Sequence, residues 1–352
     1  MSSSPELGAL RSELRAAGVF EHTELRSWLK LGVLLGGLAA CLVAIAIGGI
    51  WVAVIAVPIA SVCATSAAML GHEGSHRSLS ESPTRNTLIV MIAFPLLSGL
   101  SALFWRNKHD RLHHGHPNVV GVDTDIAPFP FVSSREEHER CGPKQRWFQR
   151  NLQGWIFWPM STLMAVGMRG SSIIYLVRYA RREGIDRAWV LEVACAIAHY
   201  TLWLVVPSLI WGPIAAFAVY SAIYAGVGIL LALIFAPAHM GLPVTDGQHH
   251  DWRHQLETTR NLELPRAVSF FFVGLDFQVE HHLFPKIPHH HLRKAARITR
   301  AWCAREGVPY LSELYLHALA DAARFMATAW KRPAARPDDV RAGAPQLARQ
   351  SG

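Results

Sequence analysis

The chain alternates long apolar blocks with polar, basic segments. Four blocks have the roughly 20 mostly apolar residues that a membrane-spanning helix needs, and they cover residues 29–47, 50–70, 189–211 and 213–237. Two glycines at 48–49 separate the first two blocks, and a Gly-Pro pair at 212–213 marks the turn between the last two. The pattern therefore predicts two helical hairpins that span a membrane.

Two shorter apolar stretches lie between the hairpins, at 87–105 and 152–168. Pro95 and Gly99 interrupt the first stretch, and a proline inside a helix removes a backbone hydrogen bond. If this stretch crossed the membrane once, the histidines on its two sides would lie on opposite faces of the bilayer. We therefore expect both stretches to be interfacial or re-entrant segments.

These patterns divide the chain into six parts. The segment before the first hairpin is polar, and the Pro-, Ala- and Arg-rich C-terminal sequence predicts a disordered tail. The parts are an N-terminal segment (1–28), the first hairpin (29–70), a cap segment (71–188), the second hairpin (189–237), a second cap segment (238–330) and the tail (331–352).

Composition excludes several other classes of protein. Of the 352 residues, 51% are hydrophobic and only 17% are charged, which excludes disordered, collagen-like and small disulfide-rich chains. The five cysteines form no CxxC pair. Neither a disulfide framework nor a thiolate zinc site is therefore expected.

The basic residues predict the orientation of the hairpins. All 34 lysines and arginines lie outside the two hairpin turns, and these residues accumulate on the cytoplasmic side of short loops. Both hairpins should therefore enter the membrane from the cytoplasm and return to it. We expect a multi-pass protein of a bacterial plasma membrane, with both termini and both cap segments in the cytoplasm.

Eight of the 19 histidines gather near the predicted cytoplasmic ends of the apolar segments. Residues i and i+4 project from one face of a helix, so His72 with His76, and His109 with His113, can each hold one ion. Adjacent histidines point about 100° apart, which suits two neighbouring ions. Eight imidazoles are too many for one metal, so we expect a dinuclear site, and imidazole suits iron, copper, zinc or nickel. The eight are His72, His76, His109, His113, His114, His239, His281 and His282.

The other histidines are expected to have different roles. His199 lies inside the third apolar block and is expected to be packed or hydrogen-bonded. The run at 289–291 precedes a basic helix and is expected to be solvated or to face lipid headgroups. Five more are candidates for positions around the metal site without binding the metal: His116, His138, His249, His250 and His254.

Three motifs in this order, HEGSH, WRNKHDRLHHGHPN and GLDFQVEHHLFP, resemble the three histidine boxes of the membrane fatty acid desaturase family. Because the third box begins with glutamine (QxxHH), the chain resembles the branch of front-end and linoleoyl-CoA-type desaturases, here without a fused cytochrome b5. The resemblance covers about residues 65–315 and includes WRHQLETTRN before box three. It implies an all-α integral membrane protein with four transmembrane helices in two hairpins and a cytoplasmic helical cap that holds a dinuclear metal site.

The resemblance also implies an activity and a set of site residues. Two iron ions bound by the eight histidines would use O₂ to introduce a double bond into an acyl chain carried by CoA, acyl carrier protein or a lipid. Gln278 occupies the place of a box-three histidine in other branches and is a possible ligand. Asp110, Asp276 and Glu280 adjoin the ligands and are expected to accept the second imidazole proton. Candidates for the substrate tunnel, or for simple interfacial anchors, are Trp105, Trp252 and Phe277.

The expected partners follow from the same resemblance. The chain has no HPGG haem-binding signature, so electrons are expected from a separate donor, ferredoxin or cytochrome b5 with a reductase. Cytoplasmic arginines such as Arg146 and Arg150 would favour an acidic protein, a phosphate-bearing acyl carrier or anionic lipid headgroups. No nucleic-acid partner is expected.

Several alternatives remain open from the sequence. A small shift of the substrate would let the same scaffold act as a fatty acyl hydroxylase or acetylenase. His72-Glu73-Gly74-Ser75-His76 is also an HExxH motif, in which a zinc metalloprotease uses two histidines as ligands and the glutamate as general base. A haem-bearing electron carrier and a non-catalytic metal sensor are more remote alternatives.

Overall fold

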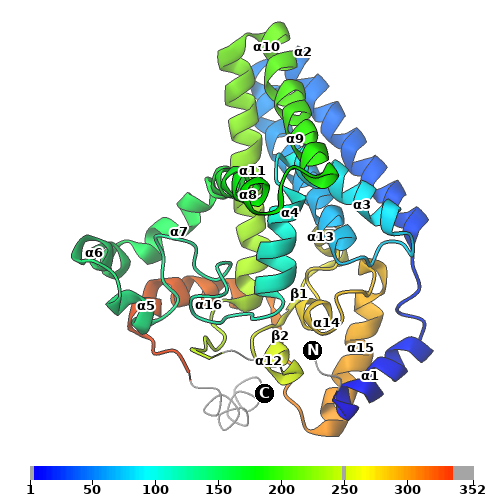
Figure 1. Ribbon diagram of the computed structural model, residues 1–352, viewed down its shortest axis with the longest axis vertical. Coiled ribbons are helices and arrows are strands. Elements are labelled where there is room, and N and C mark those ends of the chain that lie inside the picture. The colour runs from blue at the N-terminus through cyan, green and yellow to red at the C-terminus, as the bar shows by residue number, and fades with distance from the viewer. Residues whose placement is uncertain (1–3, 248–250, 336–352) are drawn as a thin grey trace.

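The computed structural model describes residues 4–247 and 251–335. The predicted tail beyond residue 335, and His249 and His250, lie outside these residues. Three helices are long and apolar enough to cross a membrane, or up to five if each bent helix pair counts as one span. Figure 1 shows these helices projecting at one end of the molecule, while the helices of the C-terminal third and the N-terminal helix gather at the other.

Helix α2 (Glu24–Ser75) contains the first two apolar blocks. Gly49 breaks it with φ 71° and ψ −172°, a conformation that glycine adopts without the steric cost of a Cβ. A Cβ on Gly37 would lie 3.2 Å from the Sγ atom of Cys63, so the two limbs of α2 run side by side on either side of the break. The break lies at the predicted turn.

The third and fourth apolar blocks form a second pair of helices. The first runs without interruption from α9 (Arg187–Tyr200) through the π-helix η3 (Thr201–Val205) to α10 (Val206–Trp211). Gly212 then has a φ of 82°, and α11 (Pro213–His239) begins directly after it. Helix α11 packs along α2, which joins the two pairs in one apolar core.

Two bent helix pairs lie between them, at the predicted interrupted stretches. The first bends by 109° at Gly99, and the second bends by 76°. A Cβ on Gly99 would lie 2.8 Å from the Cδ2 atom of His199, so the bend approaches the second helix pair closely. The first comprises α3 (Pro83–Met91), the π-helix η1 (Ile92–Ser98), α4 (Ala102–Trp105) and the π-helix η2 (Arg106–His113), and the second comprises α7 (Gln153–Ser161) and α8 (Met164–Glu183).

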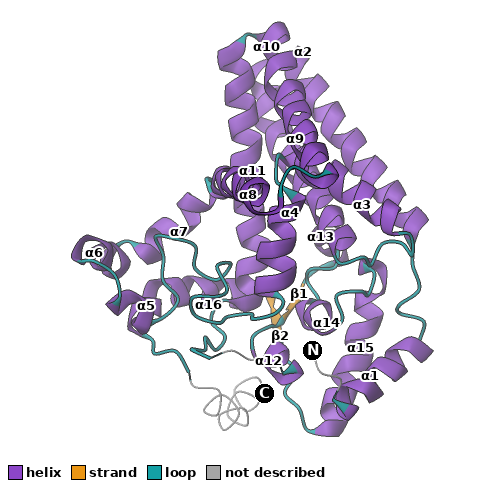
Figure 2. Ribbon diagram, in the orientation of Figure 1, coloured by secondary structure: helices purple, strands orange, loops and turns teal. Residues whose placement is uncertain are grey.

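The remaining described elements are helices outside the apolar blocks and one two-stranded sheet. Strands β1 (Asn261–Glu263) and β2 (Ser312–Leu314) pair in parallel, as the orange arrows in Figure 2 show. The all-α expectation is wrong in this detail, because three-residue strands are too short to give an alternating pattern. The helices are α1 (Pro5–Ala16), α5 (Arg135–Glu139), α6 (Pro143–Asn151), α12 (Trp252–Glu257), α13 (Arg266–Phe272), α14 (Gln278–Leu283), α15 (His289–Glu306), α16 (Tyr315–Thr328) and η4 (Ala329–Lys331), a 3₁₀ turn.

A second core, separate from the apolar helices, supports the segment that carries the third histidine box. Leu7, Leu10 and Leu14 form one face of α1 and are fully buried. They pack with side chains of α12, α14 and α15, so the N-terminal helix covers the C-terminal part of the chain. The members are Leu7, Leu10, Leu14, Val19, Trp252, Leu256, Val279, Leu283, Phe284, Ile287, Leu292, Ala295, Trp302 and Cys303.

Candidate metal centre

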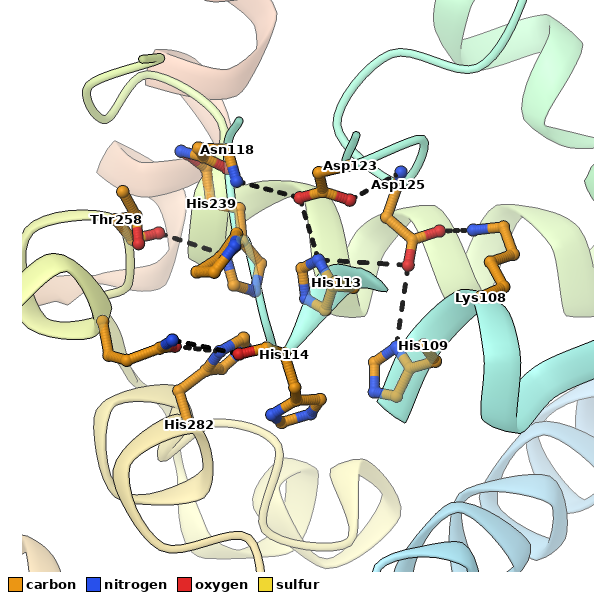
Figure 3. Close-up of polar contacts among 12 residues, drawn as sticks. Lys108, His109, His113, His114, Asn118, Asp123, Asp125, His239, Thr258 and His282 are labelled. Carbon is orange, nitrogen blue, oxygen red and sulfur yellow. Dashed lines mark hydrogen bonds and ion pairs between the residues drawn. The ribbon is translucent and has the colours of Figure 1, made fainter. Parts of the chain in front are cut away.

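The eight predicted histidines are all buried and converge from α2, η2, α11 and α14, with His76 and His114 directly after the last residues of α2 and η2. Each offers one ring nitrogen to one of two groups, within which these atoms lie no more than 4.8 Å apart. Figure 3 shows several of these rings directed toward one another between the surrounding helices. The five-histidine group is His72, His76, His109, His114 and His281, and the three-histidine group is His113, His239 and His282.

The π-helix η2 decides which box-two histidines share a group. Its backbone bonds join residues five apart, as in the 3.0 Å bond from the His114 N–H to the His109 carbonyl. His109 and His114 therefore face the five-histidine group together, and His113 faces the other group. The expected pairing of His109 with His113 on an α-helical face is corrected by this wider turn.

The second ring nitrogens of His109 and His113 face Asp125, at 3.6 and 4.0 Å. Together these three residues form a third possible cluster of ligands. The Asp125 carboxylate, however, also pairs with the Lys108 ammonium, as Figure 3 shows. Because a cation already holds this carboxylate, the two histidine groups are the better candidates for metal.

Adjacent histidines supply one ring to each group. His113 and His114 belong to different groups, and so do His281 and His282. The groups adjoin, because the rings of His114 and His282 stack with centroids 4.3 Å apart. The geometry thus offers two neighbouring positions rather than one.

Hydrogen bonds orient every ring of the three-histidine group. In each ring Nδ1 faces a protein oxygen, which leaves Nε2 directed into the group. The Nε2 atoms of His239 and His282 are buried and have no protein partner in the described residues. The three contacts are His113 Nδ1 to Asp123 Oδ2 at 2.9 Å, His239 Nδ1 to the Thr258 carbonyl at 3.1 Å, and His282 Nδ1 to Gln255 Oε1 at 2.9 Å.

Sequence reasoning assigned no role in orienting the rings to these three acceptor oxygens. Gln255 also donates its amide to the His114 carbonyl at 3.0 Å, so it contacts both box two and box three. Asp123 accepts the backbone N–H groups of Asn118 and Asp125, each at 2.9 Å. Their place in the sequence could have indicated this role, because Gln255 and Thr258 lie in the WRHQLETTRN motif and Asp123 closely follows box two.

The five-histidine group also contains nitrogen atoms that its protein surroundings do not satisfy. Nε2 of His76, both ring nitrogens of His114 and Nε2 of His281 are buried without a hydrogen-bond partner in the described part of the chain. Each such atom costs about 1–3 kcal/mol if it stays unpaired. A bound metal would use one lone pair on each of these rings, so the residues present fit a metal ion.

The protonation states agree with this fit. Burial lowers the pKa of His281 well below its usual value, and the neighbouring His72 and His76 lower it further. Burial, followed by His239 and His113, has the same effect on the pKa of His282. Both imidazoles are therefore neutral at neutral pH, as metal coordination requires.

The acidic residues adjacent in sequence to the candidate histidines have different contacts. Asp110 lies 3.7 Å from Nε2 of His76 and accepts the Ser75 hydroxyl at 3.2 Å. Asp276 instead accepts the Ser269 hydroxyl at 2.6 Å. The expectation that Asp276 accepts an imidazole proton is wrong, because its carboxylate accepts the hydroxyl of Ser269 in the middle of α13.

Glu280 also faces away from the metal centre. Its oxygens accept the Asn261 amide at 2.8 Å and the Tyr310 hydroxyl at 2.9 Å, and burial raises its pKa to about 7. The imidazole-orienting role expected for Glu280 is therefore wrong. The reason is geometric: on α14, Glu280 projects roughly 100° from His281 and 200° from His282.

Gln278 lies on the same face of α14 as His282, four residues further on. It is buried, its Nε2 atom has no partner among the described residues, and its side chain interacts with His239. The glutamine of box three thus adjoins the three-histidine group.

The aromatic candidates for the substrate tunnel separate into two places. Trp105 stacks on His109 with ring centroids 4.5 Å apart. Trp252 instead packs on Trp302 at 5.5 Å in the second core, and Phe277 packs against the same core. The tunnel role expected for Trp252 and Phe277 has no support in these contacts.

Phe235 is an aromatic contact that sequence reasoning missed. Its ring centroid lies 6.4 Å from that of His72 and 5.9 Å from that of His109, and its side chain is partly exposed. The signal was its spacing, because Phe235 precedes His239 by four residues on α11 and shares its face.

Glu73, between the two box-one histidines, faces α15. Its carboxylate accepts the His289 backbone N–H and contacts the His289 ring, both at 2.8 Å. The His289 side chain is only 6% exposed, so the expectation of a solvated or lipid-facing run is wrong for His289, whereas His290 and His291 are half-buried. A general base would face the metal-bound water, so the geometry contradicts the metalloprotease interpretation of the HExxH motif.

Three further histidines, for which the sequence predicted roles other than metal binding, also lie in the described residues. His199 is buried, with Nδ1 3.1 Å from the Leu96 carbonyl and Nε2 2.9 Å from the Tyr220 hydroxyl, which confirms that it is a hydrogen-bonded residue of the helix core. His254 lies 2.7 Å from the Pro117 carbonyl, beside box two. His138 instead pairs with Gln149 of α6, away from the metal centre.

Replacing Glu73 by glutamine is expected to leave the bound metal and most of the activity intact. Glutamine keeps an oxygen for the His289 N–H but loses the charged contact with the ring, so the free energy of unfolding should fall by about 1–3 kcal/mol. Metal content, activity and thermal unfolding of the purified variant would measure this. Complete loss of activity with the metal retained would instead indicate a catalytic base.

Comparison with known proteins agrees with the geometry. The family model described as fatty acid desaturase matches residues 22–313. The chain is 28% identical over 324 residues to fatty acid desaturase 3 of Bos taurus, which covers 90% of this chain and 71% of that protein. It is 26% identical over 330 residues to delta(8)-fatty-acid desaturase 2 of Arabidopsis thaliana, and this alignment covers 86% of this chain and 70% of that protein. The resemblance seen in the three boxes is confirmed, and the chain belongs to the fatty acid desaturase family.

Proposed function

We propose that this protein is an O₂-dependent fatty acyl desaturase that introduces a carbon–carbon double bond into an acyl chain at a histidine-ligated di-iron centre. Members of its family are oxidoreductases that act on paired donors with O₂. The observation that carries the proposal is the convergence of eight buried imidazoles into two adjoining groups. The proposed carriers of the acyl chain are CoA, acyl carrier protein or a membrane lipid.

The residues of the two histidine groups would hold the iron, and Gln278 is a further possible ligand beside the three-histidine group. Bound iron supplies the oxidant, made from O₂, that removes hydrogen from an unactivated C–H bond. Neutral imidazoles hold the metal without adding negative charge to an apolar site. Asp123, Gln255 and the Thr258 carbonyl fix the ring orientations.

Trp105 and Phe235 are the proposed contacts of the acyl chain. Both rings pack on His109, and both reach His72 from the side of the apolar helices. Aromatic side chains there would exclude water and hold one methylene next to the metal. Partly exposed Phe235 would border the route by which an apolar chain enters.

We propose that the two limbs of α2, the α9–α10 run and α11 cross the membrane as two hairpins. Their outward side chains are apolar and exposed, as for Leu209 and Ile214 at 83% and 86%, which lipid would cover. The bent pairs around Gly99 and α7–α8 would be re-entrant or interfacial. Both termini and the metal centre would then face the cytoplasm of a bacterial cell, where ferredoxin or cytochrome b5 with a reductase would supply electrons.

The test is expression in a host with defined fatty acids, iron and a supplied electron donor, followed by mass spectrometry of the lipids. A new double bond at one position is the expected result. A new hydroxyl group would support the hydroxylase alternative, and a triple bond would support the acetylenase alternative. An unchanged lipid profile from iron-loaded, reduced protein would contradict all three.

A further inference from the structure

Glu192 of α9 is buried among the apolar helices, with only 3% of its surface exposed. Its carboxylate lies at the first residues of α4, beyond the Gly99 bend. The Ser101 hydroxyl donates to Oε2 at 2.5 Å, and the Leu103 backbone N–H donates to Oε1 at 2.7 Å. In the described part of the chain, no lysine or arginine nitrogen lies within 4.0 Å of this carboxylate.

The start of α4 explains why a carboxylate is buried here. The first N–H groups of a helix have no partner within the helix, and water does not satisfy them between apolar segments. A negative charge at this end also complements the helix dipole and forms strong hydrogen bonds. Ser172 of α8 completes the arrangement, because its hydroxyl accepts the Ser101 N–H at 3.2 Å.

The residues before the bend are held in the same way. Arg169 of α8 donates from Nε to the Ser98 carbonyl at 2.8 Å, and His199 of α9 lies 3.1 Å from the Leu96 carbonyl. Side chains from α8 and α9 therefore fix the backbone on both sides of Gly99. The position of α4 is set by these contacts with α8 and α9.

Helix α4 passes directly into η2, which carries the box-two histidines. The joined helix runs from Ala102 to His113, and Trp105, two residues after Leu103, stacks on His109. A helix is stiff over this length, so a shift or rotation at its start is passed on to the three rings of box two. One residue of rotation would turn each ring by about 100°.

We propose that Glu192 is a positioning residue for the metal centre: from α9 it fixes the start of the α4–η2 helix and thereby aligns His109, His113 and His114 with the ligands from the other boxes. This inference rests on the proposed function, because it requires that the box-two histidines bind metal. Glu192 itself does not contact the metal site.

The test is titration of iron-free, full-length protein with Co²⁺ in detergent, followed by its visible absorption spectrum. Glu192→Leu has similar size but accepts no hydrogen bond, and is expected to bind Co²⁺ about 10–100-fold more weakly with altered absorption bands. Glu192→Gln keeps one acceptor oxygen and is expected to stay within about tenfold of the wild type. Glu183→Leu, at an exposed glutamate that ends α8, is the matched control and should bind as the wild type does.

A folded Glu192→Leu variant with unchanged affinity and spectrum would overturn the proposal. If this variant does not fold, Ser101→Ala decides, because it removes the hydroxyl that links Glu192 to the helix start; an unchanged spectrum there would also overturn it. Wild-type protein that binds Co²⁺ but makes no new double bond would refute the proposed function alone. Wild-type protein that binds no Co²⁺ would refute the metal centre and this proposal together.

Discussion

Replacing His281 by alanine is expected to abolish desaturation and to release iron from the protein. The His281 ring contacts three others of the five-histidine group, with its centroid 4.7 Å from those of His72 and His114 and 4.9 Å from that of His76. Alanine has no nitrogen ligand, so we expect a loss of more than about 100-fold in activity, beyond the usual effect of residues that only orient ligands. Lipid mass spectrometry and the iron content per protein measure both effects.

The matched control is His138→Ala. His138 is also buried, but it pairs with Gln149 at 2.5 Å and lies outside both histidine groups. This variant should lose some stability and keep its iron. Full iron content and an unchanged lipid profile in His281→Ala would contradict the proposed centre.

Replacing Asp123 by alanine is expected to weaken iron binding by about 10–100-fold although Asp123 contacts no metal in the proposed centre. Burial raises the pKa of this carboxyl, but its contacts with His113 and the Asn118 N–H outweigh burial and bring the pKa below its usual value. Asp123 is therefore ionised at neutral pH and holds Nδ1 of His113. Without it, the ring of His113 is free to rotate and to present the wrong nitrogen.

Metal titration and activity of Asp123→Ala, with Asp123→Asn beside it, measure this effect. Asparagine keeps an oxygen for the ring N–H, so its loss should be smaller. Asp246, an exposed aspartate, provides the control variant Asp246→Ala, which should bind metal normally. Normal binding by folded Asp123→Ala would show that His113 is oriented by other contacts.

The positions of the candidate metal-binding histidines were predictable from sequence because they depend on local patterns. All eight histidines chosen from their spacing and their resemblance to the family lie in the two groups. The turns at Gly49 and Gly212 were equally predictable, since both glycines separate long apolar blocks. In the structure both have positive φ. The spacing of histidines and the glycines between apolar blocks therefore predict these features directly.

Which of these histidines share a group was not predictable from sequence in the same way. Apolar periodicity does not distinguish an α-helix from a π-helix, so the partner of His109 changed from His113 to His114. The contact of Glu73 with His289 joins residues 216 positions apart, and a run of three histidines has no pattern that predicts burial. The same holds for Asp276 and Glu280, whose neighbours depend on how α13 and β1 pack.

The contact between Glu73 and His289 also determines when, during synthesis of the chain, box one gains its final contacts. A ribosome releases box one long before α15 exists, and the apolar helices can enter the membrane meanwhile. Yet the Glu73 carboxylate, which accepts the Ser27 hydroxyl at 3.4 Å, lacks its two 2.8 Å contacts until His289 arrives, and the buried face of α1 also waits for α15. A chain that stopped at residue 288 would contain all eight histidines without the helix that secures box one. Box one therefore reaches its final contacts only after α15 has been synthesised.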